Sequence, residues 1–136
     1  MMEPVPILLA HNGSSYMRAL RFALEVQSVK LQHVNSCRDL RRALNELHQP
    51  CVVFTDIELP DGTWMDVLAI TAKKPFHVNV VVVARLVDTQ LYVETIEKGA
   101  CDFVVPPFAD SDLNHVVRCA VDGVIRRARI GLQEGR

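Results

Sequence analysis

Five short apolar or alternating runs are interleaved with segments of helical periodicity along almost the whole chain. The runs cover residues 5–10, 29–34, 51–56, 78–83 and 102–105. In the segments that follow them, apolar residues recur at helical spacing, as Leu40, Leu44 and Leu47 do after the second run. Because the connections between these segments are short, the pattern predicts a parallel sheet with right-handed crossovers and helices on both faces.

The regularity of this alternation favours one three-layer α/β domain. Its natural winding is a flavodoxin-like (βα)5 doubly wound parallel sheet with strand order 2-1-3-4-5 and a crevice beside the first and third strands. We expect residues 1–130 to form this domain and residues 131–136 to be a frayed carboxyl-terminal tail. A chain of 136 residues is long enough to bury one sizeable core of this kind.

The composition indicates no special partner or environment. The chain has 15 basic and 16 acidic residues, so it carries no net field that would attract nucleic acid or a membrane surface. No apolar run approaches the roughly 18 residues of a membrane span and no signal sequence is apparent, so we expect a cytoplasmic protein. The cysteines are far apart without a CxxC pair, which favours buried free thiols in a reducing compartment over disulfides or zinc. They are Cys37, Cys51, Cys101 and Cys119.

The third run ends at a single acid, Asp56, and the chain then breaks into a turn at Pro60-Asp61-Gly62. Ligands bind at the carboxyl ends of the strands in open parallel sheets, so Asp56 is the first candidate for chemistry. The first run ends at His11 and Asn12, which would converge on the same crevice. The alternative is that Asp56 only begins its loop and caps the turn.

Two motifs give the chain a specific resemblance to a known family. The first is Val-Val-Phe-Thr-Asp56-Ile-Glu-Leu-Pro-Asp-Gly62, and the second is Gly99-Ala-Cys-Asp-Phe-Val-Val-Pro-Pro-Phe108. They resemble the phosphoacceptor strand and the Gly-Ala-x-x-Phe/Tyr-x-x-Lys-Pro-Phe segment in the receiver domains of two-component response regulators. The resemblance covers residues 5 to about 129 and implies a signalling domain of a phosphorelay with the doubly wound fold.

This correspondence implies roles for individual residues. Asp56 would be the phosphoacceptor and Phe103 the aromatic switch residue, and the peptide Pro106-Pro107 would be the family's cis bond. The resemblance also implies a histidine kinase or another signalling protein as partner. The fourth helix, the fifth strand and the fifth helix, with Tyr92 and Phe103, would form a face for target binding or for a homodimer.

The chain departs from the family pattern around the phosphoacceptor. His11 and Asn12 replace the pair of acids that holds a divalent cation, Ala84 replaces a Ser or Thr, and Pro106 replaces a lysine. Phosphoryl transfer to a carboxylate needs a cation, a hydroxyl and an ammonium to neutralise the phosphoryl oxygens. We therefore expect a pseudo-receiver without enzymatic activity, in which Asp56 is phosphorylated poorly or not at all. Magnesium would bind weakly at most, and no other cofactor is expected.

Alternative interpretations remain for several residues near Asp56. His11 or Arg85 could pair with Asp56 as a substitute cation, although we favour an ordinary strand-end histidine at position 11. His11, Asp56 and Glu58 could bind zinc, but one imidazole and two acids are thin evidence. Gly13-Ser14-Ser15 could bind phosphate at a helix amino end, but helix capping is the simpler explanation. For the chain as a whole, the alternative function is a flavin- or nucleotide-binding enzyme on the same fold.

Overall fold

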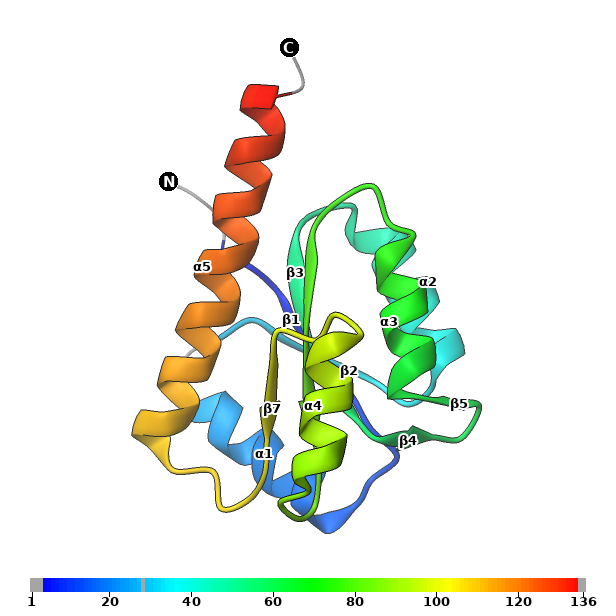
Figure 1. The fold of residues 1–136 in the computed structure, drawn as a ribbon, viewed down its shortest axis with the longest axis vertical. Coiled ribbons are helices and arrows are strands. Elements are labelled where there is room, and N and C mark those ends of the chain that lie inside the picture. Colours follow the sequence, from blue (N-terminus) through cyan, green and yellow to red (C-terminus); the bar gives the residue numbers. More distant parts are fainter. Residues whose placement is uncertain (1–3, 28, 135–136) are drawn as a thin grey trace.

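The computed structural model describes residues 4–27 and 29–134. Its centre is a five-stranded parallel sheet with the order β2-β1-β3-β6-β7 (Figure 1). The strands are β1 (Ile7–Ala10), β2 (Leu31–Val34), β3 (Cys51–Asp56), β6 (Val78–Val83) and β7 (Asp102–Val104). Counted in chain order, the five strands of this sheet have the predicted arrangement 2-1-3-4-5, so the predicted doubly wound fold is confirmed.

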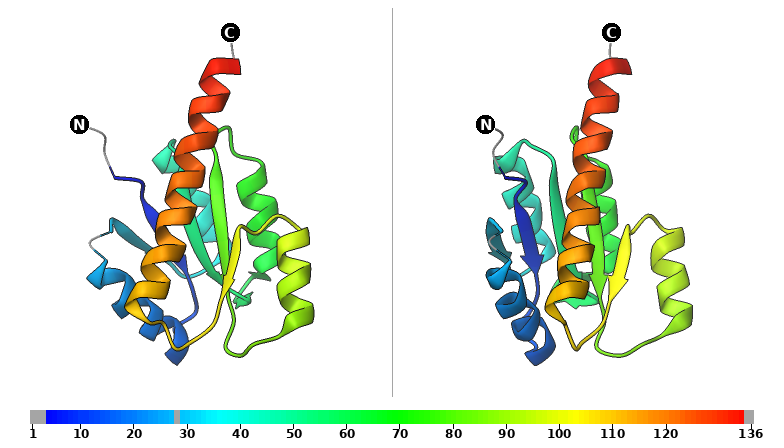
Figure 2. Two further views of the ribbon diagram at one scale, coloured as in Figure 1. Left: turned by 60° about the vertical axis from the view of Figure 1, so that its left-hand side comes forward. Right: turned by 90° about the vertical axis from the view of Figure 1, so that its left-hand side faces the viewer.

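Helices cover both faces of the sheet (Figures 1 and 2). On one face lie α1 (Ser15–Val26) and α5 (Asp110–Glu134), and on the other lie α2 (Cys37–Leu47), α3 (Trp64–Ala72) and α4 (Thr89–Glu97). Successive side chains of a strand point to opposite faces. Ile7 and Leu9 of β1 therefore join the core under α1 and α5, whereas Leu8 and Ala10 join the core under α2 and α3.

Local signals in the sequence set several helix boundaries. The side chains of Ser36 and Asp88 cap the amino ends of α2 and α4. α3 begins with a capping box between Thr63 and Asp66, in which each side chain accepts a backbone N–H from the other end of the box. Gly99 follows α4 with a φ of 113°, a conformation that L side chains rarely adopt. Ser36 and Asp88 therefore mark the predicted starts of α2 and α4, and Gly99 marks the predicted end of α4.

A small hairpin follows β3 and contacts the start of α2. Its strands are β4 (Glu58–Leu59) and β5 (Gly62–Thr63). At its tip, the carboxylate of Asp61 accepts the backbone N–H of Cys37 at 2.7 Å and that of Arg38 at 3.0 Å. The first N–H groups of a helix have no partner within the helix, so Asp61 both caps α2 and ties the hairpin to it.

The last helix is longer than predicted. Figure 1 shows the carboxyl-terminal turns of α5 projecting past the end of the sheet. The prediction of a frayed tail over residues 131–136 is wrong for residues 131–134, which continue α5, and residues 135–136 lie outside the described residues. Gly131 suggested the stop, but one glycine lowers helix stability by only about 1 kcal/mol and does not end a helix by itself.

The cysteines fall into two classes. Cys37 and Cys51 are buried as expected, whereas Cys101 and Cys119 are exposed, and all four are free thiols. Cys119 lies on the outer side of α5, which the apolar run around it did not reveal. Burial raises the pKa of the Cys51 thiol to about 12, so this thiol stays protonated at neutral pH. Within the described part of the chain, no helix is both long enough and apolar enough to span a membrane.

Candidate functional site

The carboxyl ends of β1 and β3 meet at one edge of the sheet, as predicted. Ala10 pairs with Thr55, which brings the loop after β1 beside Asp56. Asp56 is buried, with only 6% of its surface exposed. The loops after the two strands line a cavity of about 440 Å³. Its lining consists of Asn12, Gly13, Ser14, Tyr16, Asp56, Ile57 and Glu58.

Three groups donate hydrogen bonds to the Asp56 carboxylate. The Tyr16 hydroxyl and the Ile57 backbone N–H both donate to Oδ1, the N–H at 2.7 Å. The Ser14 hydroxyl donates to Oδ2 at 3.4 Å. Asp56 has no ion-pair partner among the described residues, so these bonds satisfy a buried carboxylate that no cation neutralises.

Both hydroxyls come from the beginning of α1. Ser14 occupies the amino-terminal cap position of α1, but its side chain makes no capping bond and donates to Asp56 instead, contrary to the predicted capping role. Tyr16 lies in the first turn and is half-buried. Burial, reinforced by the hydrogen bond to Asp56 and by its negative charge, raises the pKa of the Tyr16 hydroxyl. The phenol is therefore protonated at neutral pH and serves as a donor.

His11 is buried beside this site, but it bonds elsewhere. Its Nδ1 accepts the Gly13 N–H at 3.0 Å, and its Nε2 lies 3.4 Å from Nδ1 of His33. An accepting Nδ1 places the proton of the neutral ring on Nε2, so His11 donates to His33. Burial, and then the charge of His33, lower the pKa of His11. In the described part of the chain neither His11 nor Arg85 is bonded to Asp56, so the predicted pairing is not found and the strand-end histidine that we favoured agrees with the structure.

The other predicted pocket residues occupy different places. Asn12 and Glu58 are exposed and line the same cavity as Asp56. Ala84 directly follows β6, whose last residue pairs with Asp56, so it lies at the same edge of the sheet but is buried and apolar. Pro106 lies two residues after β7, and neither it nor Ala84 belongs to the cavity lining. The structure thus gathers the residues of the first and third strand ends more closely than those of the later strands.

The predicted switch residue contacts its neighbour on α4. The ring of Phe103 packs edge-to-face on Tyr92, with the ring centroids 5.8 Å apart. Phe103 is half-buried and Tyr92 is 45% exposed. Further exposed apolar side chains lie on α4 or just before it, namely Leu86, Val87, Val93 and Ile96. The peptide between Pro106 and Pro107 is cis, as the resemblance implied.

The donor set at this edge does not suit a divalent cation. Magnesium prefers several carboxylate and water oxygens in octahedral geometry. The Asp56 oxygens already accept three hydrogen bonds, and Asn12 offers an amide where a carboxylate would bind better. Across the described residues, no three His, Cys, Asp or Glu side chains lie close enough together to hold a metal ion. The alternative of a zinc site formed by His11, Asp56 and Glu58 is therefore not supported.

Sequence reasoning missed Tyr16 and the contact of Ser14 with Asp56. The apolar stripe of α1 consists of Met17, Leu20 and Leu24. Tyr16 is not part of this stripe, so the periodicity predicts no contact for it. The available signal was position, because the helix after the first strand of a doubly wound sheet starts at the crevice. A hydroxyl in its first turn is therefore within reach of an acid at the end of the third strand.

Comparisons with known proteins agree with this fold. A family model of the response regulator receiver domain matches residues 7–118. Transcriptional regulatory protein FixJ of Azorhizobium caulinodans is 28% identical over 134 residues, which are 98% of this chain and 62% of FixJ. Transcriptional regulatory protein KdpE of Mycobacterium tuberculosis is 30% identical over 115 residues, which are 85% of this chain and 50% of KdpE. The chain thus spans less than two thirds of the length of either relative.

A solved structure shows the same fold. The signal receiver domain of a putative LuxO repressor protein from Vibrio parahaemolyticus matches with a TM-score of 0.79 and 22% identity, covering 95% of this chain and 98% of that one. The alternative of a flavin- or nucleotide-binding enzyme is not favoured by these matches. Receiver domains are in general non-enzymatic signalling modules that interact with histidine kinases and other signalling proteins. The family model matches most of this chain, and Asp56 lies at the end of the third strand of the sheet. The chain therefore belongs to the response regulator receiver domain family of two-component signalling.

Proposed function

We propose that this receiver domain acts through protein–protein contact and that Asp56 accepts a phosphoryl group poorly or not at all. The observation that carries the proposal is the bonding of the Asp56 carboxylate to the hydroxyls of Tyr16 and Ser14 and to the Ile57 N–H. Attack on a phosphodonor needs a free carboxylate oxygen and positive charge beside it. In this domain a phenol and a hydroxyl take the place of that charge.

The surroundings of Asp56 also lack the groups that would stabilise the transition state. The lowered pKa of His11 keeps this ring neutral, Ala84 has no hydroxyl, and Pro106 has no ammonium. By analogy with removal of one oxyanion donor, each missing group removes about 3 kcal/mol of transition-state stabilisation. The losses at these three positions act on the same phosphoryl-transfer step, and among the described residues no cation forms an ion pair with Asp56 that would offset them.

The same chemistry makes this a non-enzymatic domain with no resident cofactor. Its oxygens at the sheet edge are one engaged carboxylate, one amide and the exposed acid Glu58, which would hold magnesium weakly at most. The near-balance of basic and acidic residues supports a protein partner over nucleic acid or a membrane. A cytoplasmic location fits the free thiols and the signalling family.

The test is intact-mass spectrometry after incubation with acetyl phosphate and magnesium. We expect the wild-type domain to keep its mass. Stoichiometric addition of one phosphoryl group that is lost in Asp56→Asn would overturn the proposal. A rescue series sharpens it: Tyr16→Phe combined with His11→Asp, Asn12→Asp, Ala84→Thr and Pro106→Lys restores the missing groups, and this variant is expected to gain the phosphoryl mass. The same series with Asp56→Asn is the matched control.

We further infer that α4, β7 and α5 form the surface for a target or a second copy. Support comes from the exposed apolar residues of α4, among them Tyr92 and Val93, beside the Tyr92–Phe103 contact. Light scattering and capture of a candidate kinase or target should show weaker association for Val93→Ser. Phe22→Ser is the control, because Phe22 is also apolar and exposed but lies on α1. Equal effects of the two substitutions would contradict this assignment.

A further inference from the structure

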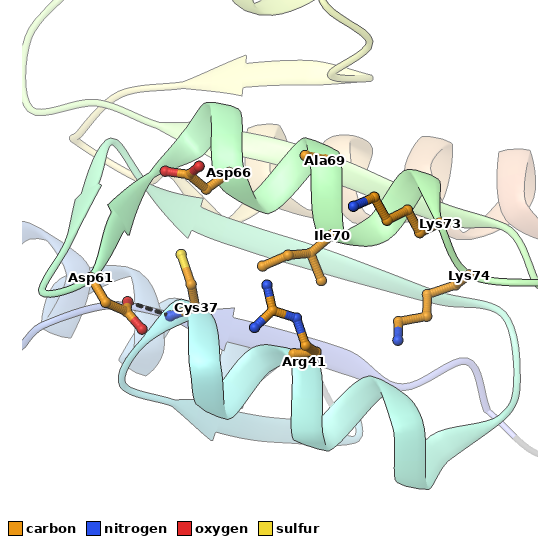
Figure 3. Close-up of a pocket in the computed structure, with 8 residues that line it drawn as sticks. All are labelled: Cys37, Arg41, Asp61, Asp66, Ala69, Ile70, Lys73 and Lys74. Carbon is orange, nitrogen blue, oxygen red and sulfur yellow. Dashed lines mark hydrogen bonds between the residues drawn. The ribbon is translucent and has the colours of Figure 1, made fainter.

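A second cavity, separate from the Asp56 site, lies between α2 and α3 (Figure 3). It has a volume of about 460 Å³. Its lining consists of Cys37, Arg41, Asp61, Asp66, Ala69, Ile70, Lys73 and Lys74. We propose that this cavity is a binding site for a small phosphate-bearing anion. The inference does not depend on the chemistry proposed for Asp56, because the two cavities share no lining residue.

Three cationic side chains line the cavity without an acidic partner. Figure 3 shows Arg41 reaching from α2 toward Ile70, with Lys73 and Lys74 at the carboxyl end of α3. None of the three takes part in an ion pair within the described residues. Lys74 donates to the neutral amide of Asn45. Cations that line one cavity repel each other, and a bound anion relieves this repulsion.

The acids of the cavity do not cancel this charge. Figure 3 shows Asp61 and Asp66 at the opposite end from the two lysines. Asp61 accepts two backbone N–H groups of α2 at 2.7 and 3.0 Å, and Asp66 accepts the Thr63 N–H at 2.8 Å. Both carboxylates are therefore bonded to the amino ends of α2 and α3, and within the described residues neither forms an ion pair with a cation of the cavity. The lysine end of the cavity keeps its positive field.

Helix ends explain only part of this arrangement. The carboxyl end of α3 favours cations, which accounts for Lys73 and Lys74 without any ligand. Arg41 is different, because it lies in the middle of α2 and still extends into the cavity. The preference of helix ends for cations therefore does not explain the position of the Arg41 guanidinium. A guanidinium can bind a phosphate through two parallel hydrogen bonds.

The size and lining of the cavity define the ligand class. Small-molecule sites in proteins have volumes of about 300–1,000 Å³, and this cavity falls in that range. Arg41 and Lys73 would hold the phosphate, and Ala69 and Ile70 would contact an apolar or sugar-like body. A phosphorylated metabolite fits this lining better than a lone inorganic ion, because the cavity extends beyond the cationic end.

The experiment is a titration of the isotope-labelled domain with pyrophosphate and, separately, with ribose 5-phosphate, followed by amide NMR at constant ionic strength. We expect saturable shifts centred on α2 and α3. Arg41→Gln and Lys73→Gln should each weaken binding by about tenfold, the loss of one charge-assisted contact. Arg42→Gln is the matched control, because Arg42 is the exposed neighbour on α2 and does not line the cavity.

Three results would overturn the proposal. They are the absence of saturable shifts with both probes, shifts centred on the loop around Asp56, and an equal loss of affinity in Arg42→Gln, which would indicate nonspecific attraction. All four proteins should give the same circular dichroism spectrum, and each substitution is on the surface, so folding is not at stake. Tighter binding of ribose 5-phosphate than of pyrophosphate would identify a metabolite as the ligand. The reverse order would overturn the assignment of Ala69 and Ile70 to a ligand body.

Discussion

Asp56 ends β3 and Asp61 lies at the tip of the hairpin that follows, but the two carboxylates are held in different ways. Asp56 is buried, and two of its three donors are side-chain hydroxyls of α1 and its cap. Asp61 is exposed, and backbone N–H groups of Cys37 and Arg38 bond both of its oxygens. The bonds of Asp61 are therefore part of the backbone fold, whereas the two hydroxyl bonds of Asp56 can each be removed by a single substitution.

The largest loss of stability should come from a substitution at Gly62, next to Asp61 in the hairpin. A Cβ at Gly62 would lie 2.6 Å from Oδ2 of Asp66 and 2.9 Å from Sγ of Cys37, so either these two side chains or the hairpin must shift, and Asp66 would lose its capping geometry. We expect Gly62→Val to lower the free energy of unfolding by about 2 kcal/mol in chemical denaturation. Gly131→Ala is the control, because its nearest neighbour would be 3.7 Å away. Equal losses in both variants would show that the hairpin contact is not the cause.

Removing the Asp61 carboxylate should have a smaller effect. Asp61→Ala leaves two N–H groups of α2 to water, which should lower the free energy of unfolding by about 1 kcal/mol, as other lost helix caps do. Asp61→Asn keeps one acceptor and should lose less. These backbone bonds also lower the pKa of Asp61. The stabilisation is therefore present above the unfolded-state pKa and is lost as the pH falls through the folded-state value. Identical acid unfolding of Asp61→Ala and the wild type would argue against this contact.

Near the Asp56 side, His11 should make stability depend on pH around neutrality. Burial and the charge of His33 lower the pKa of His11 in the folded state, so the unfolded state binds the proton more readily. The stabilisation is complete above the unfolded-state pKa of about 6.5 and decreases as the pH falls below it. Denaturation at a series of pH values should show this decrease in the wild type and a flatter profile in His11→Gln. An unchanged slope in His11→Gln would assign the effect to another group.

The smallest effect on stability is expected at Tyr16, where the ionisation of the phenol is the sharper measurement. The chain has two tyrosines, so Tyr92→Phe leaves Tyr16 as the only one. Its ultraviolet titration should show a pKa above the ordinary value, because Tyr16 is half-buried and bonded to Asp56. Asp56→Asn in the same background should bring the pKa part of the way back, since burial remains. If Asp56→Asn leaves the pKa of the Tyr16 hydroxyl unchanged, the hydrogen bond between the two side chains is not present in solution.

Periodicity and local capping predicted the fold well, because these signals involve neighbours in sequence. The all-buried run of β3, the Ser36 cap and Gly99 each have one physical interpretation, and the sheet order follows from the alternation of strands and helices. The position of Asp56 also follows from its place at a strand end. The hydrogen-bond partners of Asp56 could not be predicted in this way, because the rotamer of Tyr16 depends on packing between distant segments. A cation from His11 or Arg85 was one alternative for the partner of Asp56, and the structure places the phenol of Tyr16 there.

The overhang of α5 has a mechanical consequence for signalling. A helix of 25 residues is about 37 Å long, whereas a six-residue strand such as β6 spans only about 20 Å. The distal turns of α5 therefore have no strand beneath them, whereas residues such as Val117 and Val124 anchor the helix on the sheet. If a partner on α4 or β7 tilted α5 by a few degrees, the roughly 15 Å of helix from Val124 to Glu134 would carry its tip about 1 Å sideways.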